Sequence, residues 1–107
     1  MKDIDWRKTE YKALVEAVLA LKNRDEAERF LRDLLTPEEI EEFAGRYKTA
    51  CLLTAEVPYS EIKTLTGMST TTIARVSKWL QGELGGYRTI IARLHHDAPI
   101  SRERGVR

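Results

Sequence analysis

The sequence of 107 residues has little of several residue types, and each shortage excludes a class of protein. Its one cysteine, Cys51, cannot form a disulfide within the chain, so we expect a reducing compartment, the cytoplasm. No stretch approaches the roughly 18 consecutive apolar residues of a membrane span. The N-terminus is charged at Lys2, Asp3 and Asp5 and lacks the apolar core of a signal peptide.

The sequence also lacks the patterns of catalytic and metal sites. It contains no nucleophile paired with a base, no glycine-rich phosphate loop and no carboxylate pair in an evident cleft, so we expect neither an enzyme nor a required cofactor. His95, His96 and Asp97 are consecutive. Neighbouring side chains on a helix point about 100° apart, which makes these residues a poor zinc site. Solvated residues at a helix end are the better interpretation.

The net charge of +1 conceals an asymmetry along the chain. Residues 1–45 carry 8 Lys and Arg against 12 Asp and Glu, whereas residues 46–107 carry 10 against 5. A basic second half is typical of a surface that faces a polyanion such as DNA. Charge alone leaves open the alternative that both halves are simply solvated.

Apolar residues recur at helical spacing along most of the chain, and no strand alternation is present. We therefore expect an all-α fold. Asp25, followed by Glu28, is the expected N-cap of the second helix, and Thr36-Pro37 is the strongest helix start in the sequence. Cys51 falls on an apolar stripe as a small core residue. The expected helices cover residues 9–22, 25–35, 37–55, 60–66, 70–81 and 87–95, in one domain over 1–95, followed by a flexible basic tail over 96–107.

Residues 59–81 predict a helix-turn-helix. Gly67 falls in a tight turn between two helical patterns, where a left-handed backbone suits glycine. Both helices of this motif must bury one face, while the second helix exposes the other to the DNA major groove. The side chains expected to point inward are Ile62, Leu65, Met68, Ile73, Val76 and Leu80.

The outward face of the second helix predicts contacts to DNA. Hydroxyl groups can bond phosphates or base edges, methyl groups can meet thymine methyls, and cations add attraction to the backbone. Lys63 on the preceding helix is a further phosphate contact, although that position commonly holds a small residue. The alternative is that the hydroxyl run only caps a helical hairpin. The candidate DNA-binding residues are Lys63, Ser69, Thr70, Thr71, Thr72, Ala74, Arg75 and Lys78.

Over residues 9–95 the sequence resembles the Trp repressor family, and more closely its uncharacterised YerC/YecD relatives. The resemblance rests on residues 30–39 (FLRDLLTPEE), on Arg46, on residues 60–62 (SEI) and on residues 72–77 (TIARVS). It implies an all-helical homodimer with interlocked N-terminal helices, and two recognition helices reading half-sites about one DNA turn apart. It also implies regulation of transcription, by repression.

The resemblance further implies a pocket for a small effector. Thr36, Arg46 and Arg75 match pocket residues of the repressor. Val76 stands where the repressor has glycine, and Trp79 where it has a serine near the ligand. Added bulk in a filled site excludes the ligand, so we expect L-tryptophan not to bind, and Trp79 is a candidate to occupy its space. A different small effector, or none, remains open, as does a simple pair of Arg46 with Glu42.

A second hypothesis comes from a different class. The same helical scaffold, without sequence-specific DNA binding, is also suited to a protein-interaction module that binds a partner helix in a groove. Steep loss of binding with rising salt would favour DNA, whereas a helix-in-groove contact is less sensitive to salt.

Overall fold

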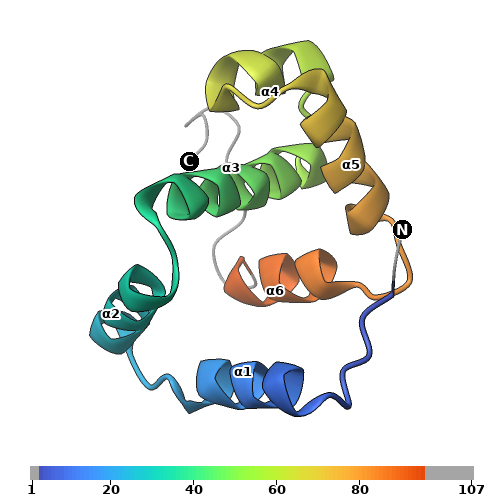
Figure 1. The fold of residues 1–107 in the computed structure, drawn as a ribbon. Helices are drawn as coiled ribbons and strands as arrows, with labels where there is room; N and C mark the ends of the chain where they lie inside the picture. Colours follow the sequence, from blue (N-terminus) through green and yellow to red (C-terminus); the bar gives the residue numbers. More distant parts are fainter. Residues whose placement is uncertain (1–2, 96–107) are drawn as a thin grey trace. The chain divides into compact units, whose positions relative to one another are not determined.

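The computed structural model describes residues 3–95, and this part of the chain contains six helices and no strand (Figure 1). The predicted all-α fold is confirmed. None of the helices in residues 3–95 is long and apolar enough to cross a lipid bilayer. The basic tail predicted for residues 96–107 lies outside the described residues. The helices are α1 (Thr9–Ala20), α2 (Arg24–Leu34), α3 (Pro37–Thr54), α4 (Tyr59–Thr66), α5 (Thr70–Leu80) and α6 (Gly86–Leu94).

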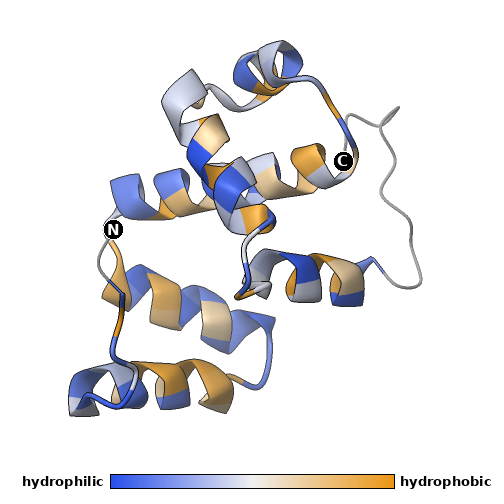
Figure 2. Ribbon diagram, turned by 90° about the vertical axis from the view of Figure 1, so that its right-hand side faces the viewer, coloured by the Kyte–Doolittle hydropathy of each residue, from blue (hydrophilic) through white to orange (hydrophobic). Residues whose placement is uncertain are grey.

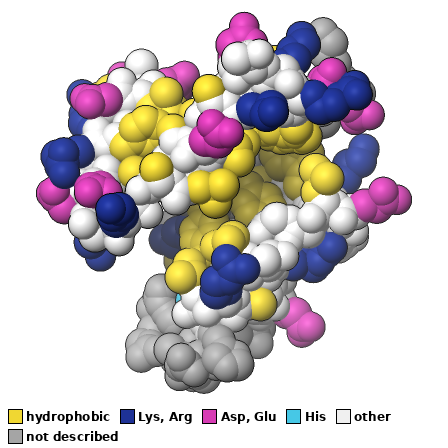
Figure 3. All heavy atoms as spheres, turned by 90° about the horizontal axis from the view of Figure 1, so that it is seen from below, with side chains coloured by type: hydrophobic (Ala, Val, Ile, Leu, Met, Phe, Trp, Pro, Cys, Tyr) yellow, Lys and Arg dark blue, Asp and Glu magenta, His cyan; other side chains and the backbone are white. Residues whose placement is uncertain are grey.

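The described residues divide into two compact units, residues 3–37 and residues 38–95. The first unit holds α1 and α2, and none of its described side chains is buried. Leu19 is 77% exposed and Val18 52% exposed. Figure 2 shows the apolar stripes along both helices, and Figure 3 shows hydrophobic side chains uncovered among charged ones. Such uncovered apolar stripes are typical of helices that bury their surface against a partner.

The start of α2 corrects one prediction. Asn23, not Asp25, is the N-cap, because its side-chain oxygen accepts a hydrogen bond of 2.9 Å from the backbone N–H of Glu26. Glu26 in turn accepts from the backbone N–H of Lys22 at 3.0 Å. Asp25 instead pairs with Arg29 one helical turn later at 2.8 Å. The N-cap therefore lies two residues before the predicted one, and asparagine is as good an N-cap as aspartate.

The second unit packs α3 to α6 around two small cores. In Figures 1 and 2, α3 lies between α4 and α6, and α5 connects these two sides. One core contains Leu52, Val57, Ile62 and Ile73, and the other contains Ala50, Val76 and Ile91. Both cores therefore include one side chain of α5. The position of α5 depends on the packing of its neighbours on either side.

The buried residues of α3 lie toward its C-terminal end. Thr49, Ala50 and Leu52 are buried, whereas Phe43 is 45% exposed. Cys51 is half-buried and packs against the second core, as expected for a small core residue. Buried residues at the end of α3 are adjacent in sequence because α4 and α5 cover one side of the helix and α6 another.

The end of α3 is a Schellman motif. The N–H of Val57 bonds to the carbonyl of Leu52 at 3.0 Å, and the N–H of Glu56 bonds to that of Leu53 at 2.9 Å. Glu56 occupies the left-handed position, with φ of 64°. Val57 then packs against Leu52 in the first core, the hydrophobic contact that accompanies this motif. The chain is thereby turned toward Pro58 and the start of α4.

Candidate nucleic-acid interface

The turn between α4 and α5 has the predicted left-handed glycine. Gly67 has φ of 73°, and its N–H bonds to the carbonyl of Lys63 at 2.9 Å. The hydroxyl of Thr66 donates to the carbonyl of Ile62 at 2.8 Å and accepts from the N–H of Met68 at 3.1 Å. One threonine therefore fixes both sides of the turn. Thr66 was not among the residues predicted for this motif, since a threonine at a helix end has several possible partners.

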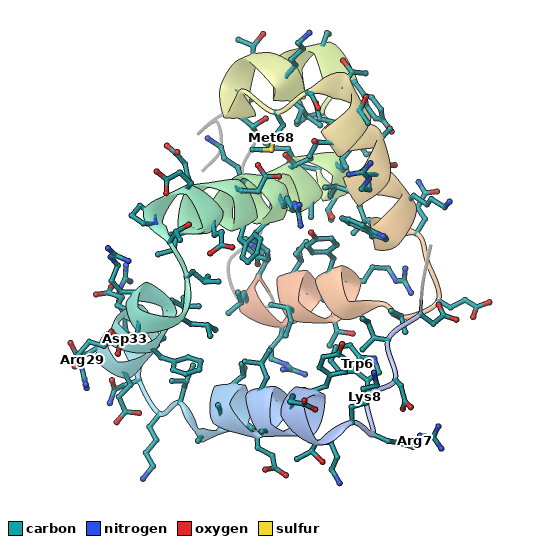
Figure 4. All side chains as sticks on the ribbon, viewed as in Figure 1. Trp6, Arg7, Lys8, Arg29, Asp33 and Met68 are labelled. Carbon is teal, nitrogen blue, oxygen red and sulfur yellow. The ribbon has the colours of Figure 1, made fainter. Side chains whose placement is uncertain are left out.

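Met68 fills the turn, as predicted, and it also contacts α3. Its side chain points from the turn toward α3 in Figure 4 and packs against the first core. The contact falls on Gly45, where an added Cβ would lie 2.3 Å from Cε of Met68. The turn and the middle of α3 thus approach more closely than any other residue at position 45 would allow without movement.

The inward face of the helix-turn-helix is confirmed with one exception. Ile62, Ile73 and Val76 have no exposed surface. Leu65 was expected to point inward but is 40% exposed and is not part of the core that holds Ile62. Leu80 is half-buried at the end of α5.

The hydroxyl run at the start of α5 divides into two pairs. Ser69 is the N-cap, since its Oγ accepts from the backbone N–H of Thr72 at 3.1 Å and donates to the Thr72 hydroxyl at 3.0 Å. Thr70 and Thr71 are exposed and have no hydrogen bond from their hydroxyls to any of residues 3–95. The structure therefore uses Ser69 and Thr72 for the cap and leaves Thr70 and Thr71 available to a ligand.

A single exposed stripe runs along α5 from its first turn to its last. Thr71, Ala74, Arg75 and Lys78 follow one another at spacings of three, one and three, and all four are exposed. Neither cation has an ion pair or hydrogen bond within residues 3–95, and α5 contains no acidic residue. Lys63 is exposed on α4, so its bulk does not hinder the approach of the two helices. The stripe offers methyls, a hydroxyl and two cations that have no partner in the described part of the chain.

The predicted effector residues have different surroundings. Arg46 is one-third exposed and pairs with Glu42 at 3.1 Å, as expected for residues one helical turn apart. Its guanidinium carbon also lies 5.5 Å from the centre of the Phe43 ring and 5.9 Å from that of the Trp79 ring. Arg75 is exposed on α5. Thr36 is exposed and belongs to the first unit.

The charge of Arg46 also acts on Tyr87 of α6. Burial raises the pKa of the Tyr87 phenol, and the Arg46 guanidinium opposes this shift. Arg46 therefore lies where α3, α5 and α6 come together. Arg46 and Trp79 were predicted from the sequence, whereas Phe43 and Tyr87 were not, because no local pattern indicates residues that only the fold brings together.

No metal site accompanies this surface in residues 3–95, where no three His, Cys, Asp or Glu side chains gather in a suitable way. His95 is the C-cap of α6. His96 and Asp97 lie outside the described residues, so the sequence-based interpretation of this histidine pair remains a prediction.

Comparison with known proteins gives one consistent match. Residues 9–95 fit a family model described as Trp repressor protein. The chain is 36% identical over 88 residues to YerC of Bacillus subtilis (strain 168), an uncharacterised protein, in a match that covers 82% of this chain and 85% of YerC. A crystal structure of a TrpR-like protein from Eubacterium eligens is 36% identical with a TM-score of 0.78, over 83% of this chain and 92% of that one. A crystal structure from Staphylococcus aureus is 34% identical with a TM-score of 0.79, over 83% and 89% of the two chains.

Proposed function

Because this chain belongs to the Trp repressor family and is similar to YerC over most of its length, we propose that it is a sequence-specific DNA-binding regulator of transcription that acts as a repressor. The helix-turn-helix of α4 and α5 is the DNA-binding element. α5 enters the major groove, and the protein binds a two-fold symmetric operator as a homodimer.

The observation that carries this proposal is the exposed stripe of α5. Arg75 and Lys78 have no partner within residues 3–95, so both charges are available to DNA phosphates or to a guanine edge. Thr71 and Ala74 offer small groups that let the helix approach the base pairs closely and meet thymine methyls. A stripe whose only role is solvation would be expected to include carboxylates, and α5 has none.

Support for a homodimer comes from the first unit taken by itself. Its helices leave Leu14, Val18, Leu19, Leu31 and Leu34 exposed, and no described side chain of residues 3–37 is buried. A second copy of the chain would remove this apolar surface from water. In a two-fold symmetric dimer, the α5 helix of each protomer would then bind one of two half-sites.

Selection of bound duplexes from a random-sequence DNA pool tests the proposal. The purified full-length protein is incubated with the pool at near-physiological salt, with and without L-tryptophan. We expect enrichment of a palindromic site whose half-sites are about one helical turn apart. Absence of enrichment at every salt concentration would contradict sequence-specific binding and favour the protein-interaction module.

Two substitutions then locate the interface. Thr71→Ala and Arg75→Ala should leave the helical content and the oligomeric state unchanged. Each should weaken binding to the selected duplex by about ten- to a hundredfold, the usual size of one lost base contact. Lys48→Ala is the matched control, since Lys48 is an exposed cation of α3 outside the stripe. If both stripe variants bind like the wild type, the DNA-binding surface lies elsewhere.

Salt dependence separates DNA recognition from recognition of a protein. The affinity for the selected duplex should fall steeply between about 50 and 200 mM salt, because the bound cations release condensed counterions. Lys78→Ala and Lys63→Ala should each make this dependence shallower without changing the preferred sequence. A dependence that neither variant alters would show that these lysines do not contact phosphates.

A further inference from the structure

Trp79 is the residue of α5 whose role the proposed interface does not explain. It is half-buried in the last turn of α5 and packs against the second core of Ala50, Val76 and Ile91. Its ring also lies beside the guanidinium of Arg46, at 5.9 Å from guanidinium carbon to ring centre. Trp79 therefore contacts an apolar core with one part of its side chain and a cation of α3 with another.

The cation beside Trp79 is itself held in place. Glu42 binds the Arg46 guanidinium at 3.1 Å, and the Phe43 ring lies 5.5 Å from it. The guanidinium is thus bound by a carboxylate and lies over two aromatic rings, one from its own helix and one from α5. A side chain restrained in this way can fix the ring of another helix, which a freely rotating lysine would not do.

The contact between Trp79 and Arg46 lies in the last turn of α5, where it can restrict movement of the helix. Ile73 and Val76 are the buried side chains of this helix and lie about 4.5 Å apart along its axis. Trp79 extends the supported length by about another 4.5 Å, toward the end of the helix opposite Thr71. A longer supported length restricts tilting of the helix, and a tilt would displace Thr71 and Arg75 relative to the DNA.

We propose that Trp79, held by Arg46, is a positioning residue that fixes the tilt of α5, so that the protein binds its operator without any small-molecule effector. This inference rests on the proposed function. In this role the Trp79 side chain itself holds α5 against α3. A bound effector is then not needed to hold the two helices together. Regulation would then depend on the amount of protein and not on a ligand at this site.

A double-mutant cycle on DNA affinity tests the pair. The variants are Trp79→Leu, which keeps an apolar side chain in the core, Arg46→Met, which keeps much of the arginine's length, and the double variant. The wild type should bind the selected duplex with no added small molecule. Each single variant should bind about five- to tenfold more weakly, and the double variant no more weakly than the worse single one. Lys48→Met is the control for loss of a positive charge from α3.

Two further measurements separate positioning from folding. Trp79→Phe keeps a ring over the guanidinium and should restore most of the affinity lost in Trp79→Leu. The melting temperatures of Trp79→Phe and Trp79→Leu should be similar, whereas their affinities for DNA should differ clearly. If the losses in Trp79→Leu and Arg46→Met are additive, or if Trp79→Phe binds no better than Trp79→Leu, the proposed pairing is wrong.

The inference and the proposed function fail in different ways. A wild-type protein that enriches a site only when L-tryptophan or a metabolite extract is added would still be a DNA-binding regulator, but Trp79 would not replace an effector. A wild-type protein that enriches no site under any of these conditions would contradict the proposed function itself. Wild-type affinity retained in every Trp79 and Arg46 variant would overturn only the positioning role.

Discussion

The terminal methyl of Met68 occupies the space beside Gly45 that a side chain would fill. A Cβ on Gly45 would lie 2.3 Å from Cε of Met68 and 3.3 Å from its sulfur. Glycine in the middle of a helix is ordinarily unfavourable, at about 1 kcal/mol relative to alanine. Its presence in α3 is explained by the contact with the turn of the helix-turn-helix (Figure 4).

The effect of Gly45→Ala should therefore depend on Met68. In the wild-type background the new methyl must displace the flexible end of the Met68 side chain, and this cost offsets the gain in helix propensity, so we expect little change in the free energy of unfolding. In a Met68→Ala background the same substitution should stabilise by up to about 1 kcal/mol, since only helix propensity remains. Urea denaturation of the four proteins measures both values. Gly86→Ala is the control, because a Cβ at Gly86 has no neighbour within 4 Å. Stabilisation in both backgrounds would contradict the close contact.

Gly67 should respond to substitution through its backbone alone. Its φ is 73°, and no atom lies within 4 Å of the position of an added Cβ. We expect Gly67→Ala to lower the free energy of unfolding by about 1–2 kcal/mol, the cost of the left-handed conformation for an L-residue. Gly67→Asn should cost less, because asparagine adopts this conformation more readily. Equal losses from both substitutions would point to a steric cause instead.

The helices and the inward face of α5 could be predicted from the sequence because their signals are local. Apolar spacing identified all six helices to within two residues, and Gly67 marked the turn. Ile73 and Val76 were expected inside and are fully buried. These predictions succeeded because an amphipathic stripe and a left-handed turn are each encoded in a few neighbouring residues.

The predictions that were wrong or missing depend on contacts that the spacing of apolar residues does not encode. Asn23 and Asp25 are both good N-cap residues, and the choice between them depends on which backbone N–H is in reach. Leu65 fits the apolar pattern three residues after Ile62, but it stands near the end of α4 and stays 40% exposed. The grouping of Arg46, Phe43 and Trp79 required the packing of α5 on α3, which no single segment specifies.

Alkaline pH should destabilise the second unit through Tyr47. Burial of its phenol, reinforced by the neighbouring Cys51 thiol, raises the pKa of Tyr47 to about 12 from an ordinary value of 10.0. The folded state thus holds this proton more tightly than the unfolded state does. The resulting stability is fully present below pH 10 and is lost as the pH rises from 10 toward 12.

Replacement of this one hydroxyl gives the measurement. Denaturant midpoints of the wild type and of Tyr47→Phe, recorded between pH 9 and 12, should separate as the pH rises, because the wild type loses stability by deprotonation of Tyr47 and the variant lacks the titrating group. Part of the decline should remain in Tyr47→Phe, since burial also raises the pKa of Tyr87. Parallel curves for the two proteins would show that Tyr47 does not titrate differently on folding.

Ser69 and Thr71 stand two residues apart in one hydroxyl run, yet they should affect different properties. Ser69→Ala removes the oxygen that accepts from the N–H of Thr72, so we expect a loss of about 1 kcal/mol in the free energy of unfolding. Ser69→Gly should lose only a few tenths, about the difference between two acceptable caps. Thr71→Ala should leave stability unchanged or slightly raised, because alanine is the better helix former at this exposed position.

The order should reverse when DNA binding is measured well below the melting temperature. Thr71→Ala should then weaken the affinity for the selected duplex more than Ser69→Gly, since the Thr71 side chain is exposed while the Ser69 hydroxyl is engaged in the cap. Both affinities are compared with that of the wild type under one salt condition, because phosphate contacts vary with salt. If Ser69→Gly proves the more damaging to binding, the serine hydroxyl itself contacts DNA, and the cap is rearranged in the complex.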